Sequence, residues 1–273
     1  MRIIEKCPVG CDSTMESSNI LLSEGALLRC PSCGQLVNPC DAETYKRRFQ
    51  PFGADNPIDK NPSMHRKRLK KIQKHVHFLP EETRLLDIGC NVGTFLQLAK
   101  KQGYLGTGVE PDANAVEAGL RSALDIRCGY LHQINLGEAR YDIVTLFEVV
   151  EHLEDPTGLL KECHRVLKPG GFLCMTTGNA RSWTAKFLKG KWDYFDLKVG
   201  HMSFFNPSSV STVARRTGFK VVKIETRSVS FKKREGSSGI KYRMAKILAE
   251  VLGLPAGLLN KGQDMFVAMR KVG

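Results

Sequence analysis

Long apolar runs are missing from this chain of 273 residues. No stretch approaches the roughly 18 consecutive apolar residues of a membrane-spanning helix, so we expect no transmembrane segment. The first residues also lack the apolar core of a signal peptide, which predicts a cytoplasmic protein. Aromatic residues make up only 8% of the chain, but hydrophobic residues make up 42%, which excludes a disordered, collagen-like or coiled-coil protein.

Acidic residues are scarce in the last third of the chain. Residues 179–273 hold 19 basic and six acidic side chains, a net formal charge of +13. Residues 81–178 hold nine basic and 14 acidic side chains, a net charge of −5. Because aromatic residues such as Trp183 and Phe205 are interleaved with the basic ones, we expect a basic surface on a folded region and an anionic binding partner.

Disulfides are not expected, although cysteines are numerous. There are nine, an odd number, and the cytoplasm keeps thiols reduced. Two short-spaced pairs lie near the N-terminus: Cys7 and Cys11, then Cys30 and Cys33. Four thiolates in this layout suit a closed tetrahedral site, so we predict a zinc-ribbon-like module over residues 1–45 with a structural Zn²⁺. Because the first pair has one extra residue, Cys40 is an alternative ligand, and ordinary reduced cysteines are the other interpretation.

Residues 46–80 are predicted to connect this module to the main domain. The first part, up to Pro62, is polar and rich in Gly and Pro. A basic amphipathic helix follows, with Leu69, Ile72 and Val76 at helical spacing. Its charges either form a solvated outer face or contact phosphate.

Residues 81–273 are predicted to form one α/β domain. Short apolar segments alternate with amphipathic helical ones, which is typical of an open sheet with helices on both faces. Residues 85–88 are a predicted strand, and glycines in the turn after it let the backbone approach a ligand. Glu110 ends the next strand, where a carboxylate can hydrogen-bond a ribose diol. The GxGxxG pattern of a dinucleotide site is missing, and Asp87 at the start of the turn suits a cationic cofactor.

Four segments, in order along the chain, resemble the motifs of class I S-adenosylmethionine-dependent methyltransferases. They are similar to motif I, the acidic loop after it, the fourth strand with its EHL signature and the turn before the fifth strand: Leu85–Phe95, Val109–Asp112, Tyr141–Pro156 and Val166–Phe172. Four ordered motifs are a specific signal, where one alone is weak. The resemblance covers residues 64–227 and a closing strand at 265–269, and it implies a Rossmann-like seven-stranded sheet with an antiparallel last strand.

The resemblance also implies which residues hold the cofactor, S-adenosylmethionine. They are Asp87, Gly89, Asn91, Gly93, Glu110, Pro111, Tyr130, Leu131 and Phe147. Asn91 stands where many members have Gly, which requires a left-handed backbone. Tyr130 stands where an Asp often contacts adenine, which shifts adenine recognition to the backbone of Leu131. Taken alone, Asp87 is equally well interpreted as a helix N-cap, and Glu110 as a surface carboxylate.

The acceptor needs to be held in line with the methyl group and, where required, to lose a proton. His201 is the predicted base, because it ends an aromatic, basic insertion after the fifth strand and can accept a proton near neutral pH. A similar His followed by aromatic residues recurs in small-molecule and sugar methyltransferases of this class. His152 and Glu148 are the further catalytic candidates. The other interpretation of His201 is a cap for the helix that begins near Pro207.

Residues 180–205 and 228–262 are predicted insertions on the substrate side. Their charge, and the similarity of the N-terminal cysteine segment to the zinc-binding leader of bacterial sugar and metabolite methyltransferases, favour an anionic small molecule: a nucleotide-linked sugar, a glycan or a secondary metabolite. The rival is a zinc-ribbon RNA (rRNA or tRNA) methyltransferase. A non-enzymatic protein that binds the cofactor or a partner is the third hypothesis. The basic amphipathic segment 240–252 covers a sheet edge, pairs two subunits of a homodimer or touches a membrane surface.

Overall fold

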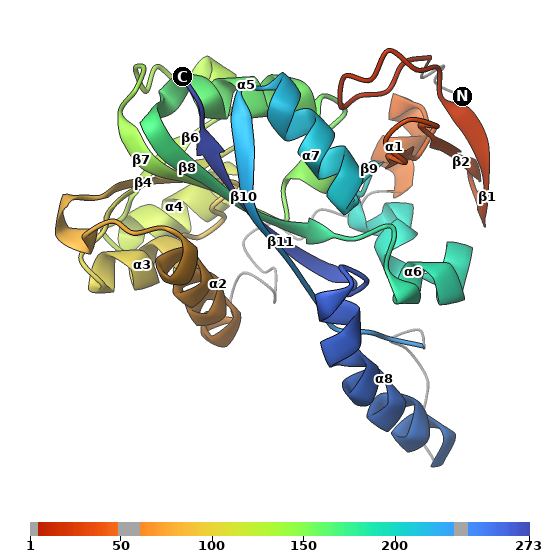
Figure 1. The fold of residues 1–273 in the computed structure, drawn as a ribbon. Helices are drawn as coiled ribbons and strands as arrows, with labels where there is room; N and C mark the ends of the chain where they lie inside the picture. Colours follow the sequence, from red (N-terminus) through yellow and green to blue (C-terminus); the bar gives the residue numbers. More distant parts are fainter. Residues whose placement is uncertain (1–4, 49–60, 232–239) are drawn as a thin grey trace.

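The computed structural model describes residues 5–48, 61–231 and 240–273. Residues 49–60 of the predicted connector and 232–239 of the second predicted insertion lie outside the described residues, as do residues 1–4. The described chain forms a seven-stranded sheet and a small four-stranded sheet (Figure 1). None of its described helices is long and apolar enough to cross a membrane.

The large sheet has the strand order β10-β11-β8-β7-β4-β5-β6. Its strands are β4 (Arg84–Ile88), β5 (Leu105–Glu110), β6 (Asp125–Cys128), β7 (Tyr141–Phe147), β8 (Leu167–Gly178), β10 (Phe219–Arg227) and β11 (Asp264–Lys271). The central strand β4 runs parallel to β5 and β7, whereas β11 runs antiparallel to both β8 and β10. The predicted seven-stranded sheet with an antiparallel last strand is confirmed. Because β4, β5 and β7 are parallel, their carboxyl ends meet at one edge.

Helices cover both faces of this sheet (Figure 1). One apolar cluster takes in α2 (Pro62–His75), α3 (Thr94–Lys101) and α4 (Ala113–Arg121), and the cluster on the other face takes in α5 (Pro156–Val166) and α7 (Pro207–Arg216). Helix α2 begins after Asn61, whose side chain accepts hydrogen bonds from the next backbone N–H groups. Its predicted apolar face is confirmed, since Leu69, Ile72 and Val76 are all buried. The basic helix α2 thus packs on the main domain through its apolar face.

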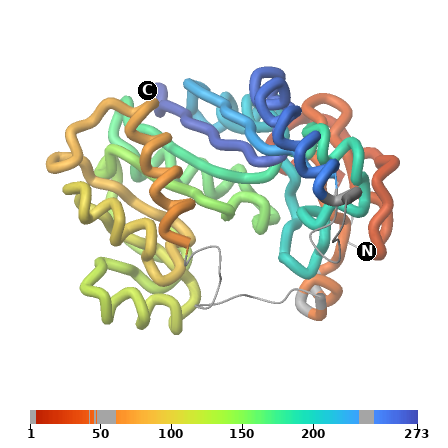
Figure 2. Tube along the Cα trace, turned by 90° about the horizontal axis from the view of Figure 1, so that it is seen from below, coloured from red at the N-terminus to blue at the C-terminus, as the bar shows by residue number. Residues whose placement is uncertain are grey.

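The small sheet joins the N-terminal module to the main domain. Its strands, in order, are β1 (Glu16–Leu22), β2 (Gly25–Arg29), β3 (Leu36–Val37) and β9 (Ser203–Phe204). Strand β3 pairs with β9 through Leu36 opposite Phe204 and Val37 opposite Ser203. In Figure 2 the red N-terminal segment accordingly lies beside the cyan segment that contains β9. The short helices α1 (Ala42–Arg48) and α6 (Trp183–Leu188) flank this junction.

Aromatic residues of the predicted insertion 180–205 fill the junction. Trp192, Phe195 and Phe204 form a buried cluster with Leu27 and Leu36 of the N-terminal module. The ring centroids of Phe195 and Phe204 are 4.8 Å apart with an interplanar angle of 83°, a favourable edge-to-face arrangement. These rings therefore bind the two parts of the molecule together.

Helix α8 (Ile240–Leu258) projects from the body of the molecule (Figure 1). It touches β10 near its end, where Ala256 is buried and its carbonyl oxygen accepts a hydrogen bond from Thr226. Farther out, Met244 and Leu254 have exposed fractions of 65% and 75%. This contact at Ala256 lies beyond segment 240–252, so covering of the sheet edge by that segment stays a prediction. Subunit pairing and membrane contact stay predictions.

Candidate active site and zinc centre

The turn between β4 and α3 has a backbone conformation that few residues allow. Gly89, Asn91 and Gly93 have φ angles of 69°, 48° and 79°. A Cβ atom on Gly89 would lie 2.7 Å from a methyl group of Val149, so glycine is needed there on steric grounds as well. Asn91 adopts the left-handed conformation that the sequence required, and its side chain accepts a hydrogen bond from the backbone N–H of Val92. The turn is therefore fixed before any ligand binds.

Glu110 lies at the end of β5 beside this turn and is only 9% exposed, so it is not a surface carboxylate. Its Oε2 accepts a hydrogen bond from the backbone N–H of Asn91, and its Oε1 accepts one from that of Asp112, both at 2.9 Å. Burial raises the pKa of Glu110, and these hydrogen bonds act in the opposite direction. Because each carboxylate oxygen has two lone pairs, Glu110 can also accept hydrogen bonds from two ribose hydroxyls.

Asp87 is buried inside β4 and does not cap a helix; its Oδ1 accepts a hydrogen bond from the Thr145 hydroxyl at 2.6 Å. Pro111 follows Glu110 directly. Beyond the end of β6, Leu131 is buried, whereas Tyr130 is 56% exposed and its ring stacks on His132. The nine residues predicted to hold the cofactor thus lie at or just after the carboxyl ends of β4, β5, β6 and β7, along one edge of the sheet.

Arg68 of α2 reaches the end of β7 and is buried there. Its Nη2 donates to Glu148 Oε1 at 3.3 Å, and its guanidinium carbon is 4.8 Å from the ring centroid of Phe147. Burial acts to raise the pKa of Glu148, but the Arg68 charge and the hydrogen bonds of neighbours such as Thr176 together outweigh it, and the pKa is lowered. Glu148 has a φ of 58°, an unfavourable conformation for a residue other than glycine. No sequence pattern indicates this role for Arg68, because basic residues occur all along the helix.

Glu151, His152 and His201 converge next to Glu148. A carboxylate oxygen and one ring nitrogen from each histidine all lie within 4.8 Å of one another. His152 Nδ1 is 3.0 Å from the carbonyl oxygen of Gly200, and His201 Nδ1 is 2.8 Å from that of Tyr194. A carbonyl only accepts, so both neutral rings carry their proton on Nδ1 and have a lone pair on Nε2. The predicted catalytic residues His201, His152 and Glu148 are thus brought together, and Asn206 caps α7 in place of His201.

The charges of this cluster are set by burial. Glu151 is fully buried, and burial together with the Glu148 charge raises its pKa well above the usual value. Burial lowers the pKa of His152, and burial and the charge of His152 lower that of His201 to about 4. Both imidazoles are therefore neutral near pH 7. Sequence reasoning missed Glu151 as a site residue, although its place just before His152 in the EHL segment was available as a signal.

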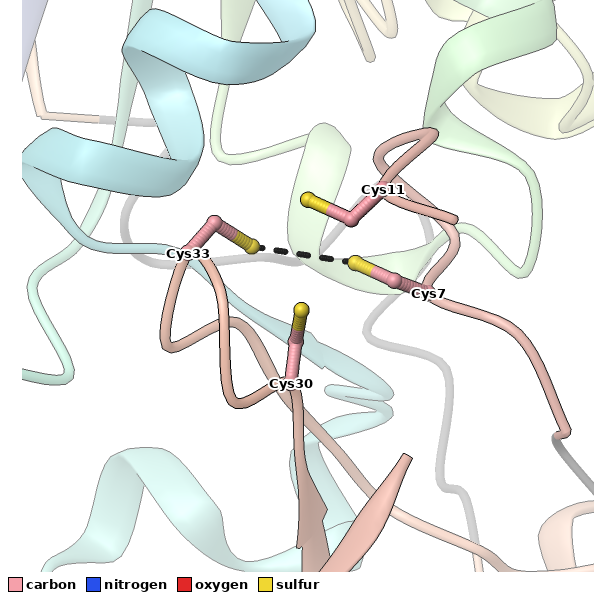
Figure 3. Close-up of side chains that lie close together, drawn as sticks. All are labelled: Cys7, Cys11, Cys30 and Cys33. Carbon is pink, nitrogen blue, oxygen red and sulfur yellow. Dashed lines mark hydrogen bonds between the residues drawn. The ribbon is translucent and has the colours of Figure 1, made fainter. Parts of the chain in front are cut away.

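Four cysteines point toward one another in the N-terminal module (Figure 3). Their sulfurs all lie within 4.8 Å of one another, and those of Cys7 and Cys33 are 3.7 Å apart. Zn–S bonds of about 2.3 Å place the sulfurs of a tetrahedral site about 3.8 Å apart, so the group fits Zn²⁺ closely. Cys40 is not part of it and packs with Leu197 and Met202. The ligand set that fits is the predicted one: Cys7, Cys11, Cys30 and Cys33.

The zinc module holds the segment that carries His201. The backbone N–H of Asn38 donates to the carbonyl oxygen of Met202 at 2.9 Å, next to the pairing of β3 with β9. The side chain of Asn206 donates to the carbonyl oxygen of Cys33 at 3.2 Å. These contacts connect the four-cysteine centre to the segment that carries His201.

Two surface hollows of about 340 and 210 Å³ lie at the junction of the two parts. They share Ser23 and Glu24 of the β1–β2 turn, and the smaller one continues along residues 190–198. None of the predicted cofactor or catalytic residues lines either hollow. The site is therefore defined by the sheet edge and its side chains.

Comparison with known proteins agrees with this geometry. The sequence profile of a family described as a methyltransferase domain matches residues 64–224, more than half of the chain. The chain belongs to this family and is a class I S-adenosylmethionine-dependent methyltransferase, with S-adenosylmethionine as its cofactor.

Curated relatives and solved structures are also similar to this chain. A ubiquinone biosynthesis O-methyltransferase of Coxiella burnetii (strain Dugway 5J108-111) is 25% identical over 188 residues, which cover 65% of this chain and 76% of the relative. The structure of a methyltransferase from Archaeoglobus fulgidus aligns with a TM-score of 0.57 and 20% identity, over 77% of this chain and 95% of that one. Phosphoethanolamine N-methyltransferase 2 of Haemonchus contortus, in complex with S-adenosyl-L-methionine, gives 0.54 and 17%, over 76% and 53%. At these identities the two structures show a shared fold.

Proposed function

We propose that this enzyme methylates a hydroxyl group on an anionic small molecule: a nucleotide-linked sugar, a glycan or a secondary metabolite. The observation that carries the proposal is the cluster of Glu151, His152 and His201 beside Glu148, since a hydroxyl must lose its proton as it is methylated. The relative named as an O-methyltransferase supports oxygen as the acceptor atom. The net charge of +13 in residues 179–273 supports an anionic substrate.

The cofactor supplies an electrophilic methyl group on its sulfonium. Glu110 would bind the two ribose hydroxyls, and Asp87 would lie near the cationic methionine end. The backbone of Gly89, Asn91 and Gly93 would line the turn around it. At the sides of the site, Pro111, Tyr130 and Leu131 would contact the nucleoside and Phe147 would border the path to the acceptor. Together these residues orient the methyl group toward the end of β7.

The acceptor would bind beside the two histidines. His201 is the first candidate to take its proton, and His152 and Glu148 are the neighbouring ones. Oxygen then bonds to the methyl carbon as the sulfur–carbon bond breaks, and S-adenosylhomocysteine leaves. The main contribution of the chain is to hold the acceptor oxygen in line with the methyl carbon and the sulfur.

The test is methyl transfer from radiolabelled S-adenosylmethionine to a panel of nucleotide sugars, anionic glycans, hydroxylated metabolites and short RNAs. We expect transfer to a small-molecule hydroxyl, and a fall of about 100-fold or more in His201→Ala with unchanged cofactor affinity. His132→Ala, which changes an exposed histidine near Tyr130, is the matched control. Salt-sensitive methylation of RNA would replace the proposal with the RNA hypothesis. Full cofactor binding with no transfer to any acceptor would favour the non-enzymatic one.

A further inference from the structure

Two imidazoles and a carboxylate meet at the acceptor end of the site. The three side chains are His152, His201 and Glu151, and their ligand atoms lie within 4.8 Å of one another. Two histidines and one carboxylate form a common ligand set for divalent transition metals, with bonds of about 2.0–2.2 Å. The cluster would contract on metal binding to bring all three atoms to these distances.

The histidines are oriented as metal-binding histidines usually are. Each donates Nδ1–H to a backbone carbonyl, His152 to Gly200 and His201 to Tyr194. Such a bond on one ring nitrogen fixes the tautomer and presents the other nitrogen as a ligand. The ring centroids are 4.7 Å apart at 66°, so the rings converge without stacking.

The carboxylate supplies an independent observation. Glu151 is fully buried, its Oε2 accepts a hydrogen bond from the Thr177 hydroxyl, and its carboxyl group lies within hydrogen-bond reach of the Glu148 carboxyl group. Glu148 lies beside it. Within the described chain these two carboxylates form one ion pair, between Glu148 and Arg68. Two carboxyl groups this close to each other repel when both are ionised, and a bound cation would offset their charges.

We propose that Glu151, His152 and His201 bind a divalent metal ion, of the class of Zn²⁺ or Mn²⁺, which coordinates the hydroxyl oxygen of the acceptor. Three protein ligands leave a coordination position open for that oxygen. Coordination favours loss of the hydroxyl proton to Glu148 and then to solvent, after which the oxygen displaces S-adenosylhomocysteine from the methyl carbon. The inference rests on the proposed function and refines it, because the histidines then act on the acceptor through the metal.

Mn²⁺ is a suitable probe, because it disfavours the four-thiolate centre, which keeps its Zn²⁺. We would titrate the whole chain, saturated with S-adenosylmethionine, and follow free Mn²⁺ by electron paramagnetic resonance. We expect one Mn²⁺ per chain, and binding weakened by about 10- to 100-fold in Glu151→Gln and in His201→Ala. Glu154→Gln and His132→Ala, at exposed positions, should bind Mn²⁺ like the wild type.

A second measurement on the wild type does not depend on how the variants fold. Electron spin-echo modulation of bound Mn²⁺ should show directly coordinated imidazole nitrogen. Absence of bound Mn²⁺, absence of nitrogen coordination, or equal binding by Glu151→Gln would each overturn the metal site. If the site binds Mn²⁺ but no hydroxyl acceptor is ever methylated, the proposed function fails and the metal site stands. If acceptors are methylated equally well without added metal and none is bound, only the metal site fails.

Discussion

Arg68 shows how one side chain can join two elements of an active site. It comes from α2, and it contacts the ring of Phe147 and the carboxylate of Glu148 at the end of β7. Removing one member of a buried ion pair leaves the other charge without compensation, which costs more than the pair itself contributes. Arg68 is thus a positioning residue for Glu148.

Replacing Arg68 with Met preserves the apolar contact with Phe147 and removes the charge. We expect the free energy of unfolding to fall by about 2 kcal/mol, less than for a fully buried pair because the Glu148 side chain is 37% exposed. Urea denaturation measures this, with Arg66→Met, on the exposed side of the same helix, as the control. Equal losses in the two variants would show that the ion pair contributes nothing specific.

Local geometry was predictable from sequence where the surroundings of a residue are local. The turn that holds Asn91 and the carboxylate of Glu110 lie within short motifs, so the chain around them determines their geometry. Arg68 was not predictable, because its partner Glu148 is 80 residues away and nothing marks it among the other basic residues of α2. Glu151 was missed because its burial depends on distant segments that pack around it.

At the scale of elements, ion pairs of Glu225 connect β10 to α2. The Glu225 carboxylate lies 2.8 Å from His75 Nε2 and 3.4 Å from Lys71 Nζ. Burial acts to raise the pKa of Glu225, but the His75 hydrogen bond and the Lys71 charge outweigh it and lower the pKa to about 2. A lowered pKa means that the ionised form stabilises the folded state.

This ion cluster predicts a pH dependence of stability. The contribution of Glu225 should be fully present above its unfolded pKa of about 4.5 and lost as the pH falls toward about 2. At pH 7, Glu225→Gln should lower the free energy of unfolding by about 2 kcal/mol after allowance for solvent screening. The difference from wild type should shrink between pH 5 and pH 3 in denaturant titrations.

Glu117→Gln serves as the control for this series, because Glu117 forms an exposed pair with Arg121 on the same helix. We expect that variant to change stability by less than about 0.5 kcal/mol at every pH. A difference for Glu225→Gln that stays constant down to pH 3 would contradict the role given to its charge.

The large sheet was predictable as a set of elements, and the small one was not. Apolar strands alternating with amphipathic helices define β4 to β8 in order, and the family resemblance supplied β11. Strands β3 and β9 have two residues each and pair across most of the chain, so no local pattern indicates them. For the same reason residues 180–205 were expected as an insertion on the substrate side, and the burial of Trp192, Phe195 and Phe204 in the junction was not foreseen.

At the scale of the whole molecule, the zinc module lies next to the proposed acceptor site. It pairs with β9, two residues beyond His201, whereas the predicted cofactor residues lie on β4 to β7 and the segments after them. A small module of this kind derives much of its folding free energy from its metal. Cofactor binding and methyl transfer should therefore respond differently to removal of Zn²⁺.

Extracting Zn²⁺ with a strong chelator should unfold the N-terminal module and lower methyl transfer by about 10-fold or more, while cofactor affinity changes less than about twofold. Circular dichroism, a turnover assay and calorimetry on the same sample would follow the three quantities. Cys40→Ser, outside the four-cysteine set, should retain its zinc. Unchanged turnover in zinc-free protein would show that the module does not support the active site.

The measurement that tests the central claim most directly is calorimetric titration of S-adenosylmethionine into the wild type and Glu110→Ala. We predict one binding site per chain in the wild type and affinity weakened by about 10- to 100-fold in Glu110→Ala, because the ribose loses its charged acceptor. Glu117→Ala, an exposed change on the neighbouring helix, should bind like the wild type. No binding by the wild type, or equal affinity in Glu110→Ala, would contradict the cofactor site described here.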